Sequence, residues 1–124
     1  MELDSDEIQF FHELAYMGAV RGLDFAAQDI FEMLAEYRPD SIYPYLGLGF
    51  NIVNNGDARK GIEILETKVL KRSPDNNQAK LYIALGYQKL KQYGKADNII
   101  REVENNNPNA DEKMLLTSLK AQNS

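Results

Sequence analysis

Three prolines recur at nearly equal intervals, and this regularity is the strongest constraint on how the chain can fold. They stand at positions 39, 74 and 108, separated by 35 and 34 residues, and each is followed by Asp or Asn. Proline ends a helix because it lacks the backbone N–H and clashes with the preceding turn, while the following Asx side chain can cap the next helix. The interval therefore indicates repeated helical units rather than one irregular core.

The pattern of small and large apolar residues repeats in the same register, but with separations of 34 and then 35 residues. The prolines are separated by 35 and then 34 residues, which is the reverse order. One extra residue between Leu65 and Pro74 explains this reversal, and we place it at the end of a helix, within 69–73. Small residues at helix crossings allow two helices to pack closely, which explains glycines inside helical segments despite a cost of about 1 kcal/mol each. The repeated positions are Ala15, Gly49 and Ala84, then Ala27, Gly61 and Ala96, and finally the larger Phe31, Leu65 and Ile100.

Each unit is predicted to be two antiparallel helices joined by a tight turn. Gly22 and Gly56 suit left-handed helix ends, and Asp24 and Asp57 suit the start of the next helix. The predicted helices cover about 5–21, 24–37, 41–54, 58–71, 76–91, 94–105 and 109–121.

The last predicted helix has the features of a terminal cap. It opens with Asn109 and has Glu112 three residues later, a capping-box arrangement. An apolar stripe of Met114, Leu115 and Leu119 is expected to cover the open end of the third unit, as the end of a repeat array requires. The sequence thus predicts one all-α domain over 1–124, with units of about 8–40, 41–75 and 76–108 and a capping helix at 109–121.

Composition and motifs argue against several functions. Zero cysteines remove disulfides and thiolate sites, and a net charge of −5 argues against nucleic-acid binding. His12 is the single histidine, and Tyr16 stands where a zinc-protease motif would need a second one; Gly47 and Gly49 lack the third glycine of a nucleotide loop. No apolar run approaches the roughly 20 residues that span a bilayer. We therefore expect a cytoplasmic protein without membrane insertion, enzymatic activity, metal site or cofactor.

These residues resemble the tetratricopeptide repeat (TPR) family, whose unit of about 34 residues carries small, large apolar and proline residues at these positions. The resemblance covers about residues 8–108, with departures at Lys80, where an aromatic is expected, and at Gly18, where tyrosine is preferred. It implies three TPR-like antiparallel helix hairpins and a C-terminal capping helix, arranged as a right-handed superhelix, or α-solenoid.

The resemblance also implies a concave binding face formed by the first helix of each hairpin. Twelve positions correspond to that face, and none of them is Lys or Arg. A carboxylate would be unpaired there, so an amphipathic helix or extended apolar segment is the expected ligand. The alternative is that some of these side chains face the core or are covered by the chain's own termini. The predicted partner-binding residues are His12, Tyr16, Tyr43, Leu46, Phe50, Val53, Leu81, Leu85 and Gln88, and the remaining positions are Gln9, Ala19 and Gln78.

Small, acidic, cysteine-free arrays of three such repeats are similar to type III secretion chaperones. The segment from Tyr45 to Gly49 is similar to the translocator-chaperone group, whereas the short length is closer to the needle-subunit group. The resemblance implies a chaperone that sequesters an amphipathic segment of a secreted subunit in its groove and prevents premature polymerisation, with a small helical co-chaperone as a possible second partner. The alternative is a general TPR adaptor in the cytoplasm. A homodimer is a further possibility, through Tyr37, Ile42, Met114 and Leu116 if these are exposed.

Overall fold

The computed structural model describes residues 2–123, apart from the side chain of Asp24, and within that range it contains helices and no strand. Every predicted helix is present, and its ends agree with the prediction to within two residues. The all-α fold expected from the repeats is therefore confirmed. The helices are α1 (Ser5–Val20), α2 (Asp24–Tyr37), α3 (Tyr43–Asn54), α4 (Ala58–Ile64) continuing into η1 (Leu65–Leu70), α5 (Asn77–Lys89), α6 (Tyr93–Glu104) and α7 (Ala110–Asn123).

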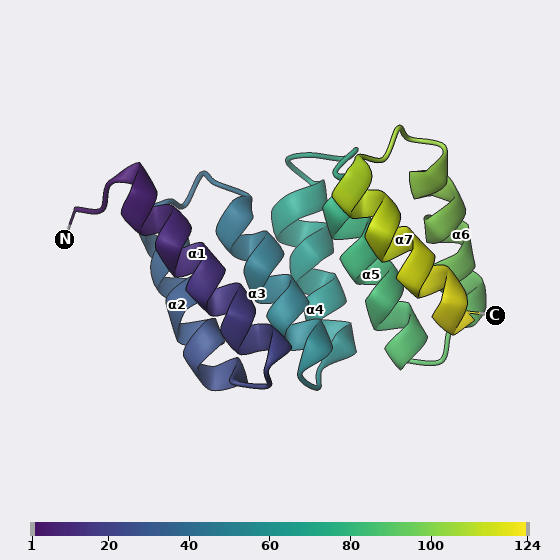
Figure 1. The fold of residues 1–124 in the computed structure, drawn as a ribbon, viewed down its shortest axis with the longest axis horizontal. Coiled ribbons are helices and arrows are strands. Elements are labelled where there is room, and N and C mark those ends of the chain that lie inside the picture. The colour runs from purple at the N-terminus through teal and green to yellow at the C-terminus, as the bar shows by residue number, and fades with distance from the viewer. Residues whose placement is uncertain (1, 124) are drawn as a thin grey trace.

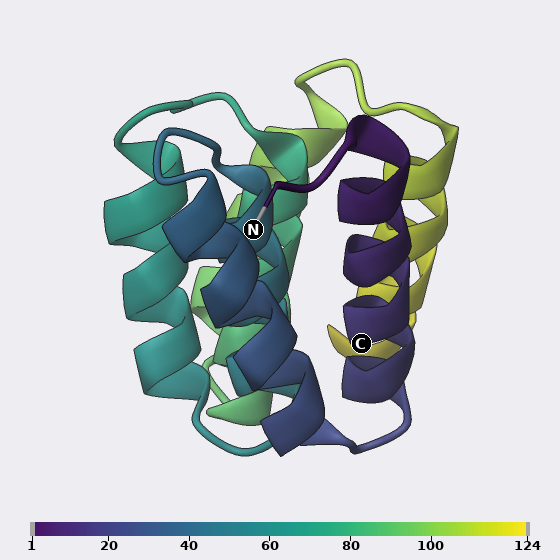
Figure 2. The same ribbon diagram turned by 90° about the vertical axis from the view of Figure 1, so that its left-hand side faces the viewer.

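The helices form a row of antiparallel hairpins that stack side by side, with the two termini at opposite ends of the row (Figure 1). The hairpins are α1/α2, α3/α4–η1 and α5/α6, and each one contacts its neighbour in the chain. The last helix, α7, packs against both α5 and α6. It lies on the same side of the molecule as α1 (Figure 2). The architecture is an α-solenoid of helix hairpins.

The extra residue of the second unit is accommodated inside a helix. Residues Leu65–Leu70 form a π-helix, in which the wider turn takes up an additional residue without breaking the helix. The π-helix forms the end of this helix, where the extra residue was predicted, but it starts four residues before the predicted range of 69–73 and overlaps it only at 69–70. Absorbing the residue in the helix keeps both Leu65 and Val69 fully buried.

Most of the predicted helix ends are capped as expected. Gly22 and Gly56 have positive φ angles of 81° and 137°. The Asp57 side chain accepts a hydrogen bond from the backbone N–H of Lys60 at 3.1 Å. The side chain of Asp24 lies outside the described part of the chain; α2 begins at Asp24 itself, with Leu23 at the cap position.

The helical glycines mark close packing, as the sequence predicted for Gly49 and Gly61. A Cβ atom added at Gly49 would lie 2.5 Å from the Cγ of Leu65, and one at Gly61 would lie 2.8 Å from the backbone nitrogen of Val53. At Gly47 a Cβ would lie 2.0 Å from the ring of Phe31. Phe31 therefore packs directly against α3, which joins the first hairpin to the second.

The core consists of three apolar clusters that follow the row of hairpins. One lies among α1, α2 and α3, a second among α3, α4, η1 and α5, and a third among α5, α6 and α7. The third cluster includes Leu116 and Leu119 of α7, so α7 covers the third unit as predicted. The predicted stripe is corrected in one respect: Met114 is 72% exposed, because the face of α7 that meets α5 carries Leu115, Leu116 and Leu119 instead.

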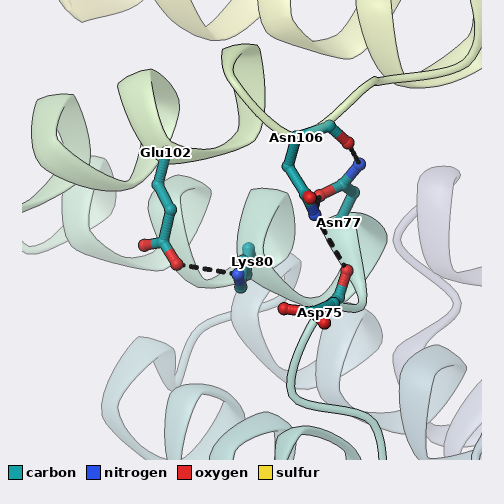
Figure 3. A network of polar contacts seen from close by, with 5 residues as sticks. All are labelled: Asp75, Asn77, Lys80, Glu102 and Asn106. Carbon is teal, nitrogen blue, oxygen red and sulfur yellow. Dashed lines mark hydrogen bonds and ion pairs between the residues drawn. The ribbon is translucent and has the colours of Figure 1, made fainter.

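Polar contacts fasten the C-terminal end. Asn77, at the start of α5, donates to the backbone oxygen of Asn106 at 3.0 Å, and Asn106 donates back to Asn77 Oδ1 at 2.8 Å (Figure 3). The Lys80 ammonium lies 2.7 Å from a Glu102 carboxylate oxygen in the same view. Asn109 and Glu112 form the predicted capping box, with backbone-to-side-chain distances of 3.0 and 2.8 Å. These contacts hold the loop before α7 against α5.

Candidate functional site: a groove beside the first helix

A groove of about 690 Å³ lies between α1, the end of α2 and the starts of α3 and α5. Its walls include side chains from six of the twelve positions that the sequence assigned to a concave binding face. The other lining residues come mainly from the start of α1 and the end of α2. The six shared residues are Gln9, His12, Tyr16, Tyr43, Leu46 and Gln78.

The wall formed by α1 follows from helical spacing and is held in place at both ends. Gln9, His12 and Tyr16 are three and four residues apart, so they lie on one face of the helix. At its N-terminal end, the backbone N–H of Leu3 donates to the Tyr37 hydroxyl at 2.8 Å, and that hydroxyl donates to the Leu3 oxygen at 3.2 Å. At the other end, the side-chain amides of Asn54 and Asn55 donate to the Ala19 oxygen at 3.3 and 3.2 Å.

A row of aromatic rings runs along the inner side of this wall and connects the three hairpins. The ring centroids of Tyr16 and Phe31 are 5.1 Å apart, those of Tyr16 and Phe50 are 5.8 Å apart, and those of Phe50 and Tyr82 are 4.8 Å apart. Such distances are typical of favourable aromatic pairs. His12 extends the row, with its ring centroid 6.0 Å from that of Phe31.

Sequence reasoning missed Tyr82, although a signal was present. Tyr82 lies three residues before Leu85, which occupies a predicted concave position, and residues three apart share a helix face. The Gln78 side chain donates to the Tyr82 hydroxyl at 2.7 Å, and Tyr16 and Tyr82 share a hydrogen bond between their hydroxyls. Tyr82 thereby joins two residues of the groove wall, Tyr16 of α1 and Gln78 of α5.

Burial keeps the Tyr16 and Tyr82 phenols and the His12 imidazole uncharged at neutral pH. Burial raises the pKa of Tyr16 far above its ordinary value of 10.0, and the contact with Tyr82 raises it further. Burial also raises the pKa of Tyr82 and lowers the pKa of His12 from 6.5. The groove therefore presents phenols and a neutral imidazole, which suit hydrogen bonding and stacking against a partner.

Arg38 brings a positive charge to the rim, from outside the twelve predicted positions. It follows directly after α2, and its guanidinium lies 5.2 Å from the centre of the Tyr37 ring. The side chain is solvent-exposed. Sequence reasoning missed it because only first helices of hairpins were considered as walls. Arg38 gives the otherwise uncharged groove a point that favours a carboxylate on the ligand.

Three of the predicted binding residues are buried inside the chain and do not reach an open face. Val53 and Leu81 are fully buried in the core, and Gln88 donates to the backbone oxygen of Leu119 in α7 at 2.7 Å. Leu85 is half-buried and packs between the second and third clusters. The expectation that the third unit lines an open surface is corrected here: α7 packs against α5 on the side where Leu81 and Gln88 lie.

The remaining predicted residues differ in accessibility. Tyr43 is 64% exposed at the groove mouth, whereas Leu46 is 1% exposed and touches the groove from within the core. Phe50 is half-buried in the aromatic row. A charged substitution at Leu46 would therefore disturb folding as well as binding, and Tyr43 is the better probe of the groove.

The four residues considered for self-association do not form one exposed set. Leu116 of α7 is buried against α5 and α6, Tyr37 is hydrogen-bonded to Leu3, and Ile42 packs against the cluster among α3, α4, η1 and α5. Only Met114 of the four is strongly exposed. These four residues therefore do not form the exposed surface that was expected for a homodimer.

Comparison with known proteins identifies the fold. No protein-family model and no curated protein matches the sequence. Among solved structures, a mutant of MamA, a TPR-containing protein, is similar with a TM-score of 0.64 at 23% sequence identity; the match covers 94% of this chain and 68% of that one. The chain thus has a TPR-like helical-repeat fold. Among the helices of residues 2–123, none combines the length and apolar character needed to cross a bilayer.

Proposed function

We propose that this chain is a protein-binding module whose groove takes an apolar or amphipathic helical segment of another protein. The observation that carries the proposal is the groove itself: it is preformed and lined by Tyr16, Tyr43 and His12. Helix-in-groove recognition uses such a surface, with apolar anchors of the ligand spaced at helical intervals. The free energy of binding would come from apolar burial at about 25 cal/mol per Å², reduced by the cost of ordering the ligand.

Arg38 indicates that the ligand carries a negative charge where it meets the rim of the groove. A helix C-terminus or an acidic side chain placed at the rim would meet the guanidinium, while the apolar face of the ligand meets His12, Tyr16 and Tyr43. This revises the expectation of a purely uncharged site. The favoured ligand has one carboxylate at its edge and an apolar stripe along its length.

As the finer function, we propose a chaperone that holds the amphipathic segment of a secreted subunit and prevents its polymerisation, as in type III secretion. The apolar groove supports this role because a segment that drives self-assembly is itself apolar on one face. The net charge of −5 would help to keep such a complex in solution. The alternative role is a cytoplasmic adaptor. The exposed Phe10, Leu14 and Met17 of α1, which lie outside the groove, favour it, since an adaptor joins two partners.

The test is affinity capture from a lysate of the source cells with wild type and two tyrosine variants. Tyr43→Glu places a charge in the groove mouth, and Tyr93→Glu is the matched control, because both tyrosines are exposed and each begins a helix. Circular dichroism should show unchanged helicity in both variants. We expect a partner that wild type and Tyr93→Glu retain and that Tyr43→Glu loses.

Retention of the same partner by Tyr43→Glu would show that the groove is not the binding site. The purified partner then separates the two finer roles. A chaperone's client polymerises alone, and light scattering should show that an equimolar amount of this protein suppresses the polymerisation. A partner that stays soluble without this protein would favour the adaptor.

A further inference from the structure

The outward face of α1 carries a second apolar surface. Phe10, Leu14 and Met17 are 57%, 42% and 52% exposed, and their spacing of four and three residues places them on one side of the helix. Val20, Leu23 and Phe25 continue the exposed apolar surface around the turn into α2. Within the described residues, six of the nine strongly exposed large apolar side chains lie between positions 10 and 25.

This surface, the α1 stripe of Phe10, Leu14 and Met17, is separate from the groove. At about 100° per residue, its centre lies about 130° around the helix from the face that carries Gln9, His12 and Tyr16. None of the three stripe residues lines the groove. A ligand can therefore occupy one surface without contacting the other.

The stripe lies in a strongly negative part of the molecule. Residues 1–37 contain nine acidic residues and one basic residue, Arg21, whereas residues 38–124 contain ten acidic and thirteen basic residues. Asp6, Glu7 and Glu13 flank the stripe on α1 and are exposed. The ion pairs among the described residues all lie between positions 80 and 120, so no described acidic side chain of residues 2–37 is neutralised by a basic one.

We propose that the α1 stripe binds a cationic amphipathic helix of another protein. Leucine-like residues of that helix would cover Phe10, Leu14 and Met17, and flanking Lys or Arg side chains would meet the carboxylates of Asp6, Glu7 and Glu13. Complementary charge accelerates association and selects the partner. A second copy of this chain is disfavoured as the occupant, because two stripes placed face to face would bring two strongly acidic hairpins together.

The experiment uses two labelled peptide probes of about 18 residues, long enough for an amphipathic helix of several turns. Both carry leucine at helical spacing. All remaining positions are lysine in one probe and glutamate in the other. Fluorescence anisotropy measures their binding to the full chain. The stripe variant is Leu14→Gln with Met17→Gln. Its control is Met114→Gln, a substitution of another exposed apolar side chain that lies on α7, and Tyr43→Glu tests the groove.

We expect the lysine probe to bind wild type, Met114→Gln and Tyr43→Glu alike, and to bind the stripe variant at least about tenfold more weakly. With the groove blocked by Tyr43→Glu, the glutamate probe should bind at least about tenfold more weakly than the lysine probe, and added salt should weaken lysine-probe binding. Circular dichroism of the stripe variant should match wild type, since both substituted side chains are exposed.

Three results would overturn the proposal. One is equal binding of the two probes to Tyr43→Glu, in which the groove is blocked, because charge would then play no part at the stripe. Another is loss of lysine-probe binding in Tyr43→Glu but not in the stripe variant, which would assign it to the groove. The third is a wild-type dimer in sedimentation velocity that the stripe variant abolishes, which would make a second copy the occupant. None of these depends on whether the groove captures a native partner.

Discussion

The C-terminal end of the solenoid is covered by a capping helix, whereas the N-terminal end leaves an apolar helix face exposed. At the C-terminal end, α7 buries Leu116 and Leu119 against α5 and α6, and the pair of Asn77 and Asn106 fixes the loop that leads into it. At the N-terminal end, α1 packs mainly against α2 and α3, and its outward face exposes Phe10, Leu14 and Met17. The closed end carries the ion pairs of the described residues, while the open end carries unneutralised acidic side chains.

This difference assigns stability and binding to different parts of one repeat array. In a solenoid, each unit is stabilised mainly by its neighbours, so a unit without a cap has less buried surface on its outer side. The N-terminal hairpin keeps both the groove and the α1 stripe, whereas α7 occupies the corresponding side of the third unit. The cap thus confines the open surfaces of this small array to its first half.

Leucine-to-alanine substitutions at the two ends should show the largest difference in their effect on the free energy of unfolding. Leu119→Ala removes a side chain that is 1% exposed and should lower the free energy of unfolding by about 3 kcal/mol, the usual cost of a cavity in a core. Leu14→Ala removes a leucine of the opposite terminal helix that is 42% exposed, and its effect should stay within about 1 kcal/mol. Urea unfolding followed by circular dichroism measures both values.

Equal losses for the two variants would contradict the comparison, because they would mean that the outward face of α1 is covered in solution. A concentration-dependent loss for Leu14→Ala would point to self-association at the open end. Wild type at several concentrations is therefore the control for this pair.

The fold could be predicted because its signals are local and repeated. Prolines at the unit ends, glycines with positive φ at the turns and small residues at the crossings each act within a few residues, and the Asn109–Glu112 capping box is readable from four consecutive positions. The extra residue of the second unit was also detectable from spacing alone. Its exact place depends on which arrangement keeps Leu65 and Val69 buried, and that is a tertiary constraint.

The candidate site was predictable in its first half only. Carrying the concave positions of the repeat onto every unit assumes that each unit has an open face, and this placed Leu81 and Gln88 on the surface. The same sequence, however, predicts a helix that covers the third unit. Combining the two predictions would have removed those residues. Arg38 could not be found this way, because it follows the second helix of a hairpin and reaches the groove only through the packing of α2 beside α1 and α3.

Polar contacts at the two ends give a second, smaller contrast. Asn106→Ala should lower the free energy of unfolding by about 1–2 kcal/mol, because it leaves the buried Asn77 side chain with an unsatisfied oxygen. Tyr37→Phe removes the hydroxyl that both donates to and accepts from Leu3, at a cost of about 1 kcal/mol, since those groups can turn to water at the open end.

Hydrogen exchange distinguishes the two substitutions by where they act. Tyr37→Phe should accelerate exchange in the first turns of α1 and leave α5 to α7 unchanged, whereas Asn106→Ala should accelerate exchange in α7 and the start of α5. Global acceleration by Tyr37→Phe would contradict the view that the open end contributes little to overall stability.

The smallest expected effect concerns His12 in the groove. Burial lowers its pKa from 6.5, so the unfolded chain takes up this proton at a higher pH than the folded chain does. The free energy of unfolding attributable to His12 should therefore be fully present above about pH 6.5 and decline as the pH falls below that value. In His12→Gln this part of the pH dependence should be absent, and the difference between the two curves isolates it from the carboxylates.

His12 is the single histidine, so its imidazole proton resonances give the pKa directly by NMR titration. A midpoint below 6.5 is expected. A midpoint above 6.5 would show that the acidic residues of the first hairpin dominate over burial, and the groove would then become positively charged under mildly acidic conditions. A groove ligand with an apolar face at His12 should lower the midpoint further, because it excludes more water from the imidazole. That shift would be the most local sign that a partner occupies the open end.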